Sequence, residues 1–597
     1  MEAEVKNTVE SLFKRKAEDF DKLVSYKLIS PILFYCDLKR ILLLRLVSKG
    51  FYHILSPTFL LGVPSPLATA ITSFHFDKIY PIIDPSIQEQ FNFFQNYAMN
   101  CIVKIKDQKE LASLQTFLLD PANKKFIDNI EVFDFKELPI NTITAGLINT
   151  LLLICFSYNG NFIAKLKTII LGDIIESSIF TLPESFNRNT TLRFGNIKEG
   201  NALTIYGSAK NLTTFSIGDI ETKTMFKLLA QLPNISSLTI GDVKQSTVVL
   251  PQALDSLTTL ITGSIENSSL SLPVSLNNLI TLDMQRISLV KIKLPDVLNN
   301  LTNLRIDINS GAIQLPNSLD SLTDLSISLG DDEEILLSDY KAKDKREILN
   351  LPNTLNNLKT FSINRTWPLP ESLNNLTTFS IEELDSDLKL SSSFHNLKTF
   401  HIDYICDHTL EITDELTNLE ILNIGAIYAK STLELSSSLN SLTTLAIEEI
   451  CGAKIILPEL KNLTSLLIGE ISNQGGSGRG KEGKWVQAEL ILPYSLNNLT
   501  ALMLGSIGYN SIIRLPSMLN NLRICTIKEI GDNVALEFPN TLDQLIFFTL
   551  GDMGKNSSLK LPESLDNLIS FTKGKMGEGS QIQEPTSWNN LMQENIH

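Results

Sequence analysis

LPNTLNNLKTFSI at residues 351–363 and LPESLNNLTTFSI at residues 369–381 are two versions of one phrase that recurs along this 597-residue chain. Further versions begin at Leu272, Leu315 and Leu492. Leucines 250, 272 and 294, each followed by a proline, lie 22 residues apart, and most later intervals are similar. Self-similarity at so short a period indicates stacked structural repeats that share one continuous core.

Each copy of the phrase contains a strand-like half and a turn-like half. The strand half, LxxLxIxxI, alternates apolar and polar residues, so its Leu and Ile are expected to point inward and the residues between them outward. The proline of the other half suits a turn or the edge of a second short strand. The Asn before the next Leu is expected to bond backbone groups of the turn, and such residues could form a ladder along the stack.

The period and the leucine pattern resemble those of leucine-rich repeat proteins, and the LPxSLxNL phrase is similar to the repeats of amoebal leucine-rich and FNIP-type proteins. The resemblance implies a solenoid of stacked parallel β-strands with short turns and few helices. We expect this solenoid over residues 161–572, with insertions near 330–348 and 471–487. Residues 59–160 are interpreted as a linker, degenerate repeats or an N-terminal cap, and residues 573–597 as a flexible polar tail.

Residues 1–58 have a different pattern, with apolar residues at helical spacing, and predict a small α-helical segment in front of the solenoid. The stretch KLISPILFYCDLKRILLLRLVSKGFYHIL at residues 27–55 resembles an F-box. That family docks on a Skp1-type adaptor, and the adaptor contacts carried over by position are Leu28, Pro31, Ile32, Leu46 and Val47. The same residues could instead form the core of a helical cap that closes the solenoid.

The composition excludes several classes of protein. Lys and Arg number 51 against 66 Asp and Glu, which gives a net charge of −15 and argues against a nucleic-acid binder or a basic membrane adaptor. The six cysteines are far apart, as in a reducing compartment. No secretory signal or membrane-spanning stretch is evident, so we expect a cytoplasmic protein, with a nuclear location as an alternative.

The outward residue just before the last Ile of each strand half forms a column in which eight of sixteen side chains are acidic. This column could attract a basic partner or could only be a solvated edge. Its members are Asp173, Asp219, Asp242, Ser264, Arg286, Ile308, Leu329, Arg365, Glu383, Tyr404, Ala426, Glu449, Glu470, Ser506, Glu529 and Asp552.

Three outward positions nearer the start of the strand halves become apolar, at Ala446, Leu467 and Met503. An apolar patch beside carboxylates is typical of a protein-binding surface. The sequence therefore predicts a partner-binding site from the following residues: Glu383, Ala446, Glu449, Leu467, Glu470, Met503 and Glu529.

Motifs for chemistry are weak, and we expect a non-enzymatic chain without cofactor or metal. GGSGRGK at residues 475–481 fits the spacing of a phosphate-binding loop, but Glu482 replaces the Ser or Thr that such a loop needs. His401, Cys406 and His408 are close in sequence but lack the spacing of a zinc site.

Two functions are consistent with these patterns. The first is substrate recognition in an SCF-type (Skp1–cullin–F-box) ubiquitin ligase, with a Skp1-type adaptor and a basic protein substrate as partners. The alternative is a leucine-rich repeat scaffold or recognition protein with no link to ubiquitin.

Overall fold

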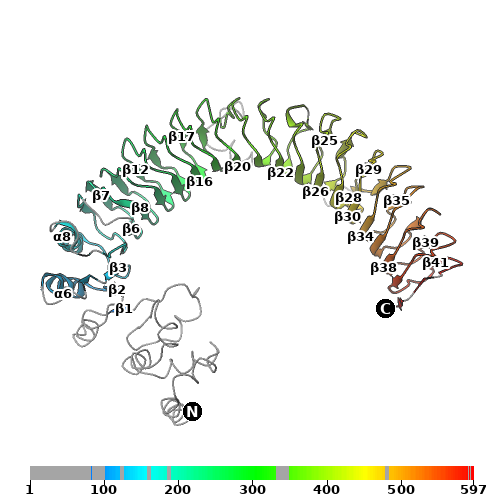
Figure 1. The fold of residues 1–597 in the computed structure, drawn as a ribbon, viewed down its shortest axis with the longest axis horizontal. Helices are drawn as coiled ribbons and strands as arrows, with labels where there is room; N and C mark the ends of the chain where they lie inside the picture. Colours follow the sequence, from blue (N-terminus) through cyan, green and yellow to red (C-terminus); the bar gives the residue numbers. More distant parts are fainter. Residues whose placement is uncertain are drawn as a thin grey trace, which may run out of the picture. The chain divides into compact units, whose positions relative to one another are not determined.

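The structure is a computed structural model, and it describes residues 82–83, 101–120, 127–128, 130–157, 163, 165–184, 190–330, 348–390, 392–476, 483–588, 590–591 and 593–596. The chain divides into two compact units, residues 1–275 and 276–597. Each unit is a stack of parallel β-strands in which one turn of the chain pairs with the next (Figure 1). The chain is therefore a solenoid of leucine-rich repeats with few helices, as the sequence predicts.

The first unit has two parallel sheets. Strands of the main sheet are β1 (Ile82–Ile83), β2 (Cys101–Lys104), β3 (Ile130–Phe135), β4 (Thr168–Leu171), β6 (Thr190–Phe194), β8 (Leu212–Ile217), β10 (Ser237–Ile240), β11 (Val243–Lys244), β13 (Thr259–Thr262) and β14 (Ile265–Glu266). The second sheet contains β5 (Ser178–Leu182), β7 (Ala202–Gly207), β9 (Met225–Leu228), β12 (Thr247–Val249) and β15 (Ser269–Ser271). Within each sheet the pairing is parallel, and nearly every residue pairs with the equivalent residue of the next repeat.

Two helices, α6 (Gln108–Leu119) and α8 (Thr142–Ser157), lie in residues 59–160, for which the sequence predicts a linker, degenerate repeats or a cap. Asp107 caps α6 by accepting a hydrogen bond from the backbone N–H of Glu110 at 2.8 Å. The Asn149 side chain of α8 donates to and accepts from the backbone of β5. Since β2 and β3 pair with each other and β3 with β4, this region forms strand–helix repeats continuous with the main sheet.

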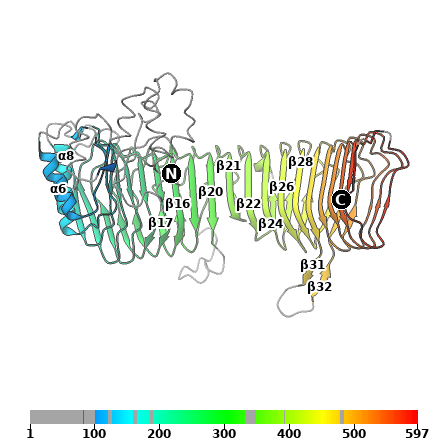
Figure 2. The same cartoon turned by 90° about the horizontal axis from the view of Figure 1, so that it is seen from below.

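The main sheet of the second unit runs along one side of its turns (Figure 2). Its strands are β16 (Thr281–Ser288), β18 (Asn303–Ile308), β20 (Asp324–Leu329), β21 (Thr360–Arg365), β22 (Thr378–Leu384), β24 (Thr399–Ile405), β26 (Ile421–Tyr428), β28 (Thr444–Cys451), β30 (Ser465–Ser472), β34 (Ala501–Ile507), β36 (Ile524–Ile530), β38 (Phe547–Met553), β40 (Ser570–Lys573) and β42 (Gln593–Ile596).

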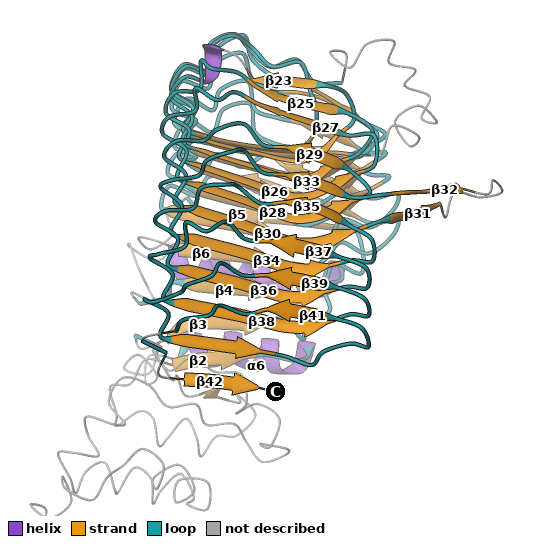
Figure 3. Ribbon diagram, turned by 90° about the vertical axis from the view of Figure 1, so that its right-hand side faces the viewer, coloured by secondary structure: helices purple, strands orange, loops and turns teal. Residues whose placement is uncertain are grey.

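Shorter strands lie on the other side of the same turns (Figure 3). They form separate small parallel sheets: β17 (Lys291–Lys293) with β19 (Ala312–Gln314); β23 (Leu388–Leu390), β25 (Thr409–Ile412) and β27 (Thr432–Leu435); β29 (Lys454–Ile456), β33 (Glu489–Ile491) and β35 (Ile512–Arg514); and β37 (Ala535–Glu537), β39 (Ser558–Lys560) and β41 (Gln581–Gln583). A single 3-10 turn, η4 (Ser392–Phe394), interrupts one connection in the described part of this unit.

The core of each turn consists of the leucines and isoleucines that the sequence pattern assigns to the interior. In β28, for example, Leu445, Ile447 and Ile450 are buried, whereas the residues between them reach the surface. Phenylalanines replace leucine in consecutive turns and stack on each other, with Phe379 5.3 Å from Phe361 between ring centroids. The predicted inward column is confirmed.

The predicted asparagine ladder is also present. The side-chain amide of Asn375 donates to the backbone carbonyl of Asn356, one turn earlier, at 2.6 Å. Thr377, two residues further, donates its hydroxyl to the Lys359 carbonyl at 3.0 Å. The same pair of bonds recurs along the second unit, at Asn300 with Thr302, Asn462 with Thr464, and Asn498 with Thr500. Each of these four Asn-Leu-Thr triplets therefore binds its turn to the preceding one.

Two segments differ from the sequence expectation. The stretch from residue 573, expected to be a flexible tail, contributes β41, which pairs with β39, and β42, which pairs with β40. These turns have polar residues at strand positions, which hides the leucine pattern, but the backbone pairing needs no particular side chain. Within the second expected insertion, β31 (Gln474–Gly476) and β32 (Gly483–Val486) form an antiparallel hairpin outside the row of main strands (Figure 2).

Candidate protein-binding surface on the second unit

The outward side chains of the main strands from β22 to β38 form the surface that we call the strand face. Backbone register places equivalent residues of successive strands side by side, so that Ala446, Leu467 and Met503 lie in one row. Glu383, Glu449 and Glu470 lie in a second row, with Tyr404 and Ala426 between Glu383 and Glu449. The alignment of repeats in the sequence thus brings six of the seven predicted partner-binding residues together on strands β22 to β34 of the strand face.

The seventh predicted residue, Glu529, lies in β36 on the same row as Ser506 and Asp552. Lys528 precedes it and is also exposed, so the local charge at this point of the row is mixed. Glu529 is therefore at the far end of the strand face from Glu383, and the two belong to different electrostatic surroundings.

One part of the strand face is uniformly acidic. Strands β22, β24, β26, β28 and β30 are consecutive in the sheet and contain six carboxylates but no Lys or Arg. We call these carboxylates the acidic segment: Glu382, Glu383, Asp403, Glu448, Glu449 and Glu470. The only ion pair that any of them forms within the described ranges joins Asp403 Oδ1 to His401 Nε2 at 2.6 Å. Like charges on strands about 4.8 Å apart repel, so the segment favours a cationic ligand.

The negative potential of this segment acts on side chains at the ends of the same strands. Burial raises the pKa of the Cys451 thiol, and the nearby Glu449 and Glu470 carboxylates raise that pKa further. Burial and Glu449 likewise raise the pKa of Tyr428, which pairs with Cys451 in the sheet. Both groups therefore remain neutral at pH 7.

Next to the acidic segment, four large apolar side chains are exposed on four consecutive strands. Leu467 of β30 and Met503 of β34 retain 37% and 42% of their accessible surface. Ile524 of β36 and Phe547 of β38 retain 39% and 47%. Ile524 and Phe547 pair directly with each other in the register of their strands. We call these four residues the apolar strip, because they present one large apolar side chain per strand across the sheet.

Sequence reasoning missed Ile524 and Phe547. They occupy the position that precedes the first buried residue of the strand, where several copies have Thr, as at Thr378 and Thr444. Comparison of the copies at this position would have found the change to Ile and Phe. The apolar patch therefore extends beyond Met503 in the direction of β38.

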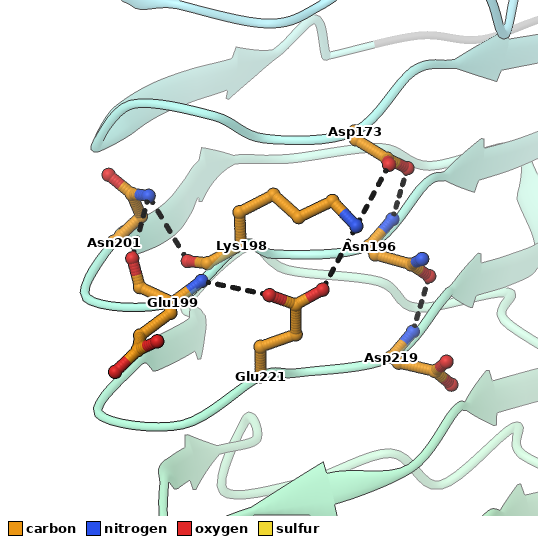
Figure 4. A network of polar contacts seen from close by, with 7 residues as sticks. All are labelled: Asp173, Asn196, Lys198, Glu199, Asn201, Asp219 and Glu221. Atoms are coloured by element: carbon orange, nitrogen blue, oxygen red, sulfur yellow. Dashed lines mark hydrogen bonds and ion pairs between the residues drawn. The ribbon is translucent and has the colours of Figure 1, made fainter.

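The acidic column is a different feature in the first unit, where its members bond the backbone (Figure 4). Asp173 Oδ1 accepts from the Asn196 N–H at 2.9 Å, and Asn196 Oδ1 accepts from the Asp219 N–H at 2.8 Å. Asp219 and Asp242 continue the pattern to the next turns. We call this series the Asx ladder. Its carboxylates accept structural hydrogen bonds, so they are not a docking surface of the kind found in the second unit.

Lysine also reduces the charge of the Asx ladder. Lys198 Nζ lies 3.3 Å from Asp173 and 2.9 Å from Glu221, and so bridges three successive turns (Figure 4). The hydrogen bond from Lys198 to Glu221 raises the pKa of the amine, which keeps it protonated. Neutralised carboxylates of this kind attract a basic partner less than those of the acidic segment.

Two members of the predicted column are not on the surface. Ile308 pairs with Ile287 and Leu329 pairs with Ile308, and both residues are buried. In β16 the two residues Gln285 and Arg286 stand opposite the single residue Asp307. Strands β18 and β20 therefore have one residue, where β16 has two, between their last two inward positions. Counting residues from the start of each repeat then reaches the inward residue in place of the outward one. The assignment of Ile308 and Leu329 to the outward column is therefore wrong.

The weak chemical motifs acquire no supporting geometry in the described residues. A phosphate-binding loop requires a helix after its lysine, whereas Gly483–Val486 is the strand β32. His401 is bonded to Asp403, and His408 lies 3.6 Å from Asp387 on another turn. Within the described ranges no three His, Cys, Asp or Glu side chains are grouped as metal ligands would be.

The predicted adaptor contacts Leu28, Pro31, Ile32, Leu46 and Val47 lie outside the described residues, as does most of residues 1–100. Among the helices that the structure does describe, none has the length and apolar character needed to cross a bilayer.

Comparison with known proteins returned no matching family model and no matching curated protein. Solved structures similar to this chain include the plant peptide hormone receptor RGFR1 in complex with RGF2, at 14% identity and a TM-score of 0.28, covering 79% of this chain and 90% of the receptor. A Leptospira interrogans LRR protein matches at 15% identity and a TM-score of 0.26, covering 80% of this chain and 94% of that protein.

A third similar structure is the LRR ectodomain of the Arabidopsis thaliana receptor kinase GASSHO1/SCHENGEN3 in complex with CASPARIAN STRIP INTEGRITY FACTOR 2. It is 13% identical, with a TM-score of 0.15, and the match covers 85% of this chain and 81% of that one. At these scores the fold of the present chain is established by its own strand pairing.

Proposed function

We propose that this chain is a protein-recognition solenoid that binds a basic partner protein on the strand face of its second unit. The observation that supports the proposal is the apolar strip, Leu467, Met503, Ile524 and Phe547, beside an acidic segment whose strands contain no Lys or Arg. Exposed apolar side chains on a rigid sheet provide binding energy, and the carboxylates favour partners of opposite charge and speed their association.

The test is affinity capture with the intact protein and two variants of equal charge change. Met503→Glu places a carboxylate inside the apolar strip, whereas Tyr494→Glu does so at a side chain that is 63% exposed outside the strand face. We expect partners held by the unmodified chain and by Tyr494→Glu to be lost from Met503→Glu. Identical capture by all three chains would contradict the proposal.

The finer form of the proposal is that the chain is the substrate receptor of an SCF-type ubiquitin ligase, with a Skp1-type adaptor on residues 27–55. Its support is the resemblance of that stretch to an F-box. A double change, Leu46→Ala with Val47→Ala, in the full chain would then abolish adaptor capture and leave partner capture by the strand face intact. Recovery of partners without any adaptor would favour a recognition scaffold with no ubiquitin link.

A further inference from the structure

The spacing of the apolar strip indicates the conformation of its ligand. Leu467 pairs with Met503 and Ile524 pairs with Phe547, but Met503 pairs with Thr526, two residues beyond Ile524. The strip therefore covers three strand intervals of about 4.8 Å and shifts by about 6.6 Å along the strands between β34 and β36. A ligand that follows the strip obliquely across the strands must therefore offer four apolar side chains over about 16 Å.

An α-helix meets this requirement better than an extended chain. One helical turn advances about 5.4 Å, so a helix that repeats apolar residues at i, i+4 and i+7 covers about 16 Å in three turns and matches the strip from β30 to β38 within about 1 Å. Side chains on one edge of an extended chain are about 6.6 Å apart, so three such steps cover about 20 Å and exceed the length of the strip by about 4 Å.

The charge distribution on the strand face gives the ligand a direction. From β22 to β30 the outward residues include the six carboxylates of the acidic segment, and the apolar strip occupies only β30 and the strands that follow it. The row of Glu449 and Glu470 continues at Glu529 and Asp552, but Lys528 makes the charge of β36 mixed. The uniformly acidic strands and the strands of the apolar strip therefore largely follow one another along the stack, and they overlap at β30. A complementary helix has Lys or Arg along one half and an apolar stripe along the other.

We propose that the strand face of the second unit binds an amphipathic basic helix that lies across strands β22–β38, with its cationic half on the acidic segment and its apolar half on the apolar strip. This inference rests on the proposed function and specifies the partner's binding element. Seven strand intervals of about 4.8 Å span roughly 34 Å, the length of a helix of about 22 residues.

Synthetic fluorescent peptides of 22 residues test this inference. Two peptides have the same composition, with leucines at i, i+4 and i+7 in one half and lysines in the other, and differ only in which half comes first. We expect one of them to bind the full chain, and we expect Met503→Glu to weaken binding at least tenfold while Tyr494→Glu changes it less than twofold. Two prolines in the apolar half of that peptide, which break the helix, should also weaken binding at least tenfold.

The contribution of the acidic segment to binding is measured separately, through the salt dependence of the peptide affinity. Binding of the helical peptide to the unmodified chain should weaken as salt rises. In the double variant Glu449→Gln with Glu470→Gln, both the affinity and its salt dependence should fall, because two carboxylates that face the lysines are neutral. An unchanged salt dependence in this variant would remove the acidic segment from the interface.

The outcomes separate this inference from the proposed function. If the proline peptide binds within twofold of the helical peptide, the ligand is not a helix, although the strand face still binds proteins. If neither helical peptide binds while partner capture still depends on Met503, the helix inference fails and protein recognition stands. If capture is also independent of Met503, both fail.

Discussion

At the scale of a single residue, Gly218 shows how the Asx ladder restricts which side chain can stand beside it. A Cβ atom at this position would lie 2.2 Å from Asn196 Oδ1, the atom that accepts the hydrogen bond from Asp219. The residue type is therefore set by the side chain of the preceding turn. Sequence reasoning grouped Asp173, Asp219 and Asp242 with the acidic column, because it did not include this contact between turns.

Gly218→Ala is expected to lower the free energy of unfolding by about 1–3 kcal/mol, since the added methyl group must displace the Asn196 carboxamide and weaken the ladder. Urea denaturation measures the change. Gly146→Ala is the matched control: no atom lies within 4 Å of its added Cβ, and in an exposed helical position it should stabilise by about 0.5–1 kcal/mol. Equal stability of Gly218→Ala and the unmodified chain would show that the ladder tolerates the extra atom.

At the scale of single strands, register is the property that sequence predicts best. Copies of equal length align residue for residue, and for that reason the repeat pattern alone places Ala446, Leu467 and Met503 side by side. The prediction failed for Ile308 and Leu329, where a bulge in the preceding strand changes the count by one residue. Which outward residues remain free of structural bonds was also not predictable, because that depends on neighbouring turns.

The field of the acidic segment can be measured through the thiol of Cys451. Glu449 raises the pKa of this thiol, so Glu449→Gln should lower the pKa and increase the thiolate fraction at a given pH. Since the thiolate is the reactive form, alkylation of Cys451 by iodoacetamide at pH 8 should become faster, as followed by mass spectrometry of its peptide. Glu434→Gln, in β27 of a smaller sheet, serves as the control and should leave the rate unchanged. A slower reaction in Glu449→Gln would contradict the proposed field.

On the scale of the whole molecule, stability is a sum over neighbouring turns and not the property of one central core. In the second unit Phe379 illustrates this, since its ring lies between those of Phe361 and Phe400, at centroid distances of 5.3 and 5.4 Å. Each turn thus contacts chiefly the turns before and after it. The repeat period predicts this behaviour, while the ends of the array and its hairpin do not follow from the period.

Phe379→Ala is expected to cost about 3–5 kcal/mol, because it leaves a cavity within the stack of rings. Hydrogen exchange should then accelerate in β21, β22 and β24 but remain slow in β36 and β38, several turns away. Phe547→Ala, at a side chain that is 47% exposed, should leave exchange in all these strands nearly unchanged. Uniform acceleration after Phe379→Ala would mean that the second unit unfolds as one cooperative block.

The paired Asn and Thr side chains of the turns have a consequence for covalent modification. Asn-Leu-Thr fits the acceptor rule for N-linked glycans, but in Asn300, Asn375, Asn462 and Asn498 the nitrogen that would receive the sugar already donates to a carbonyl of the previous turn. A glycan there would have to displace a bond that joins two turns. The abundance of this triplet therefore reflects how the turns are held together, and it carries no information about the compartment in which the chain resides.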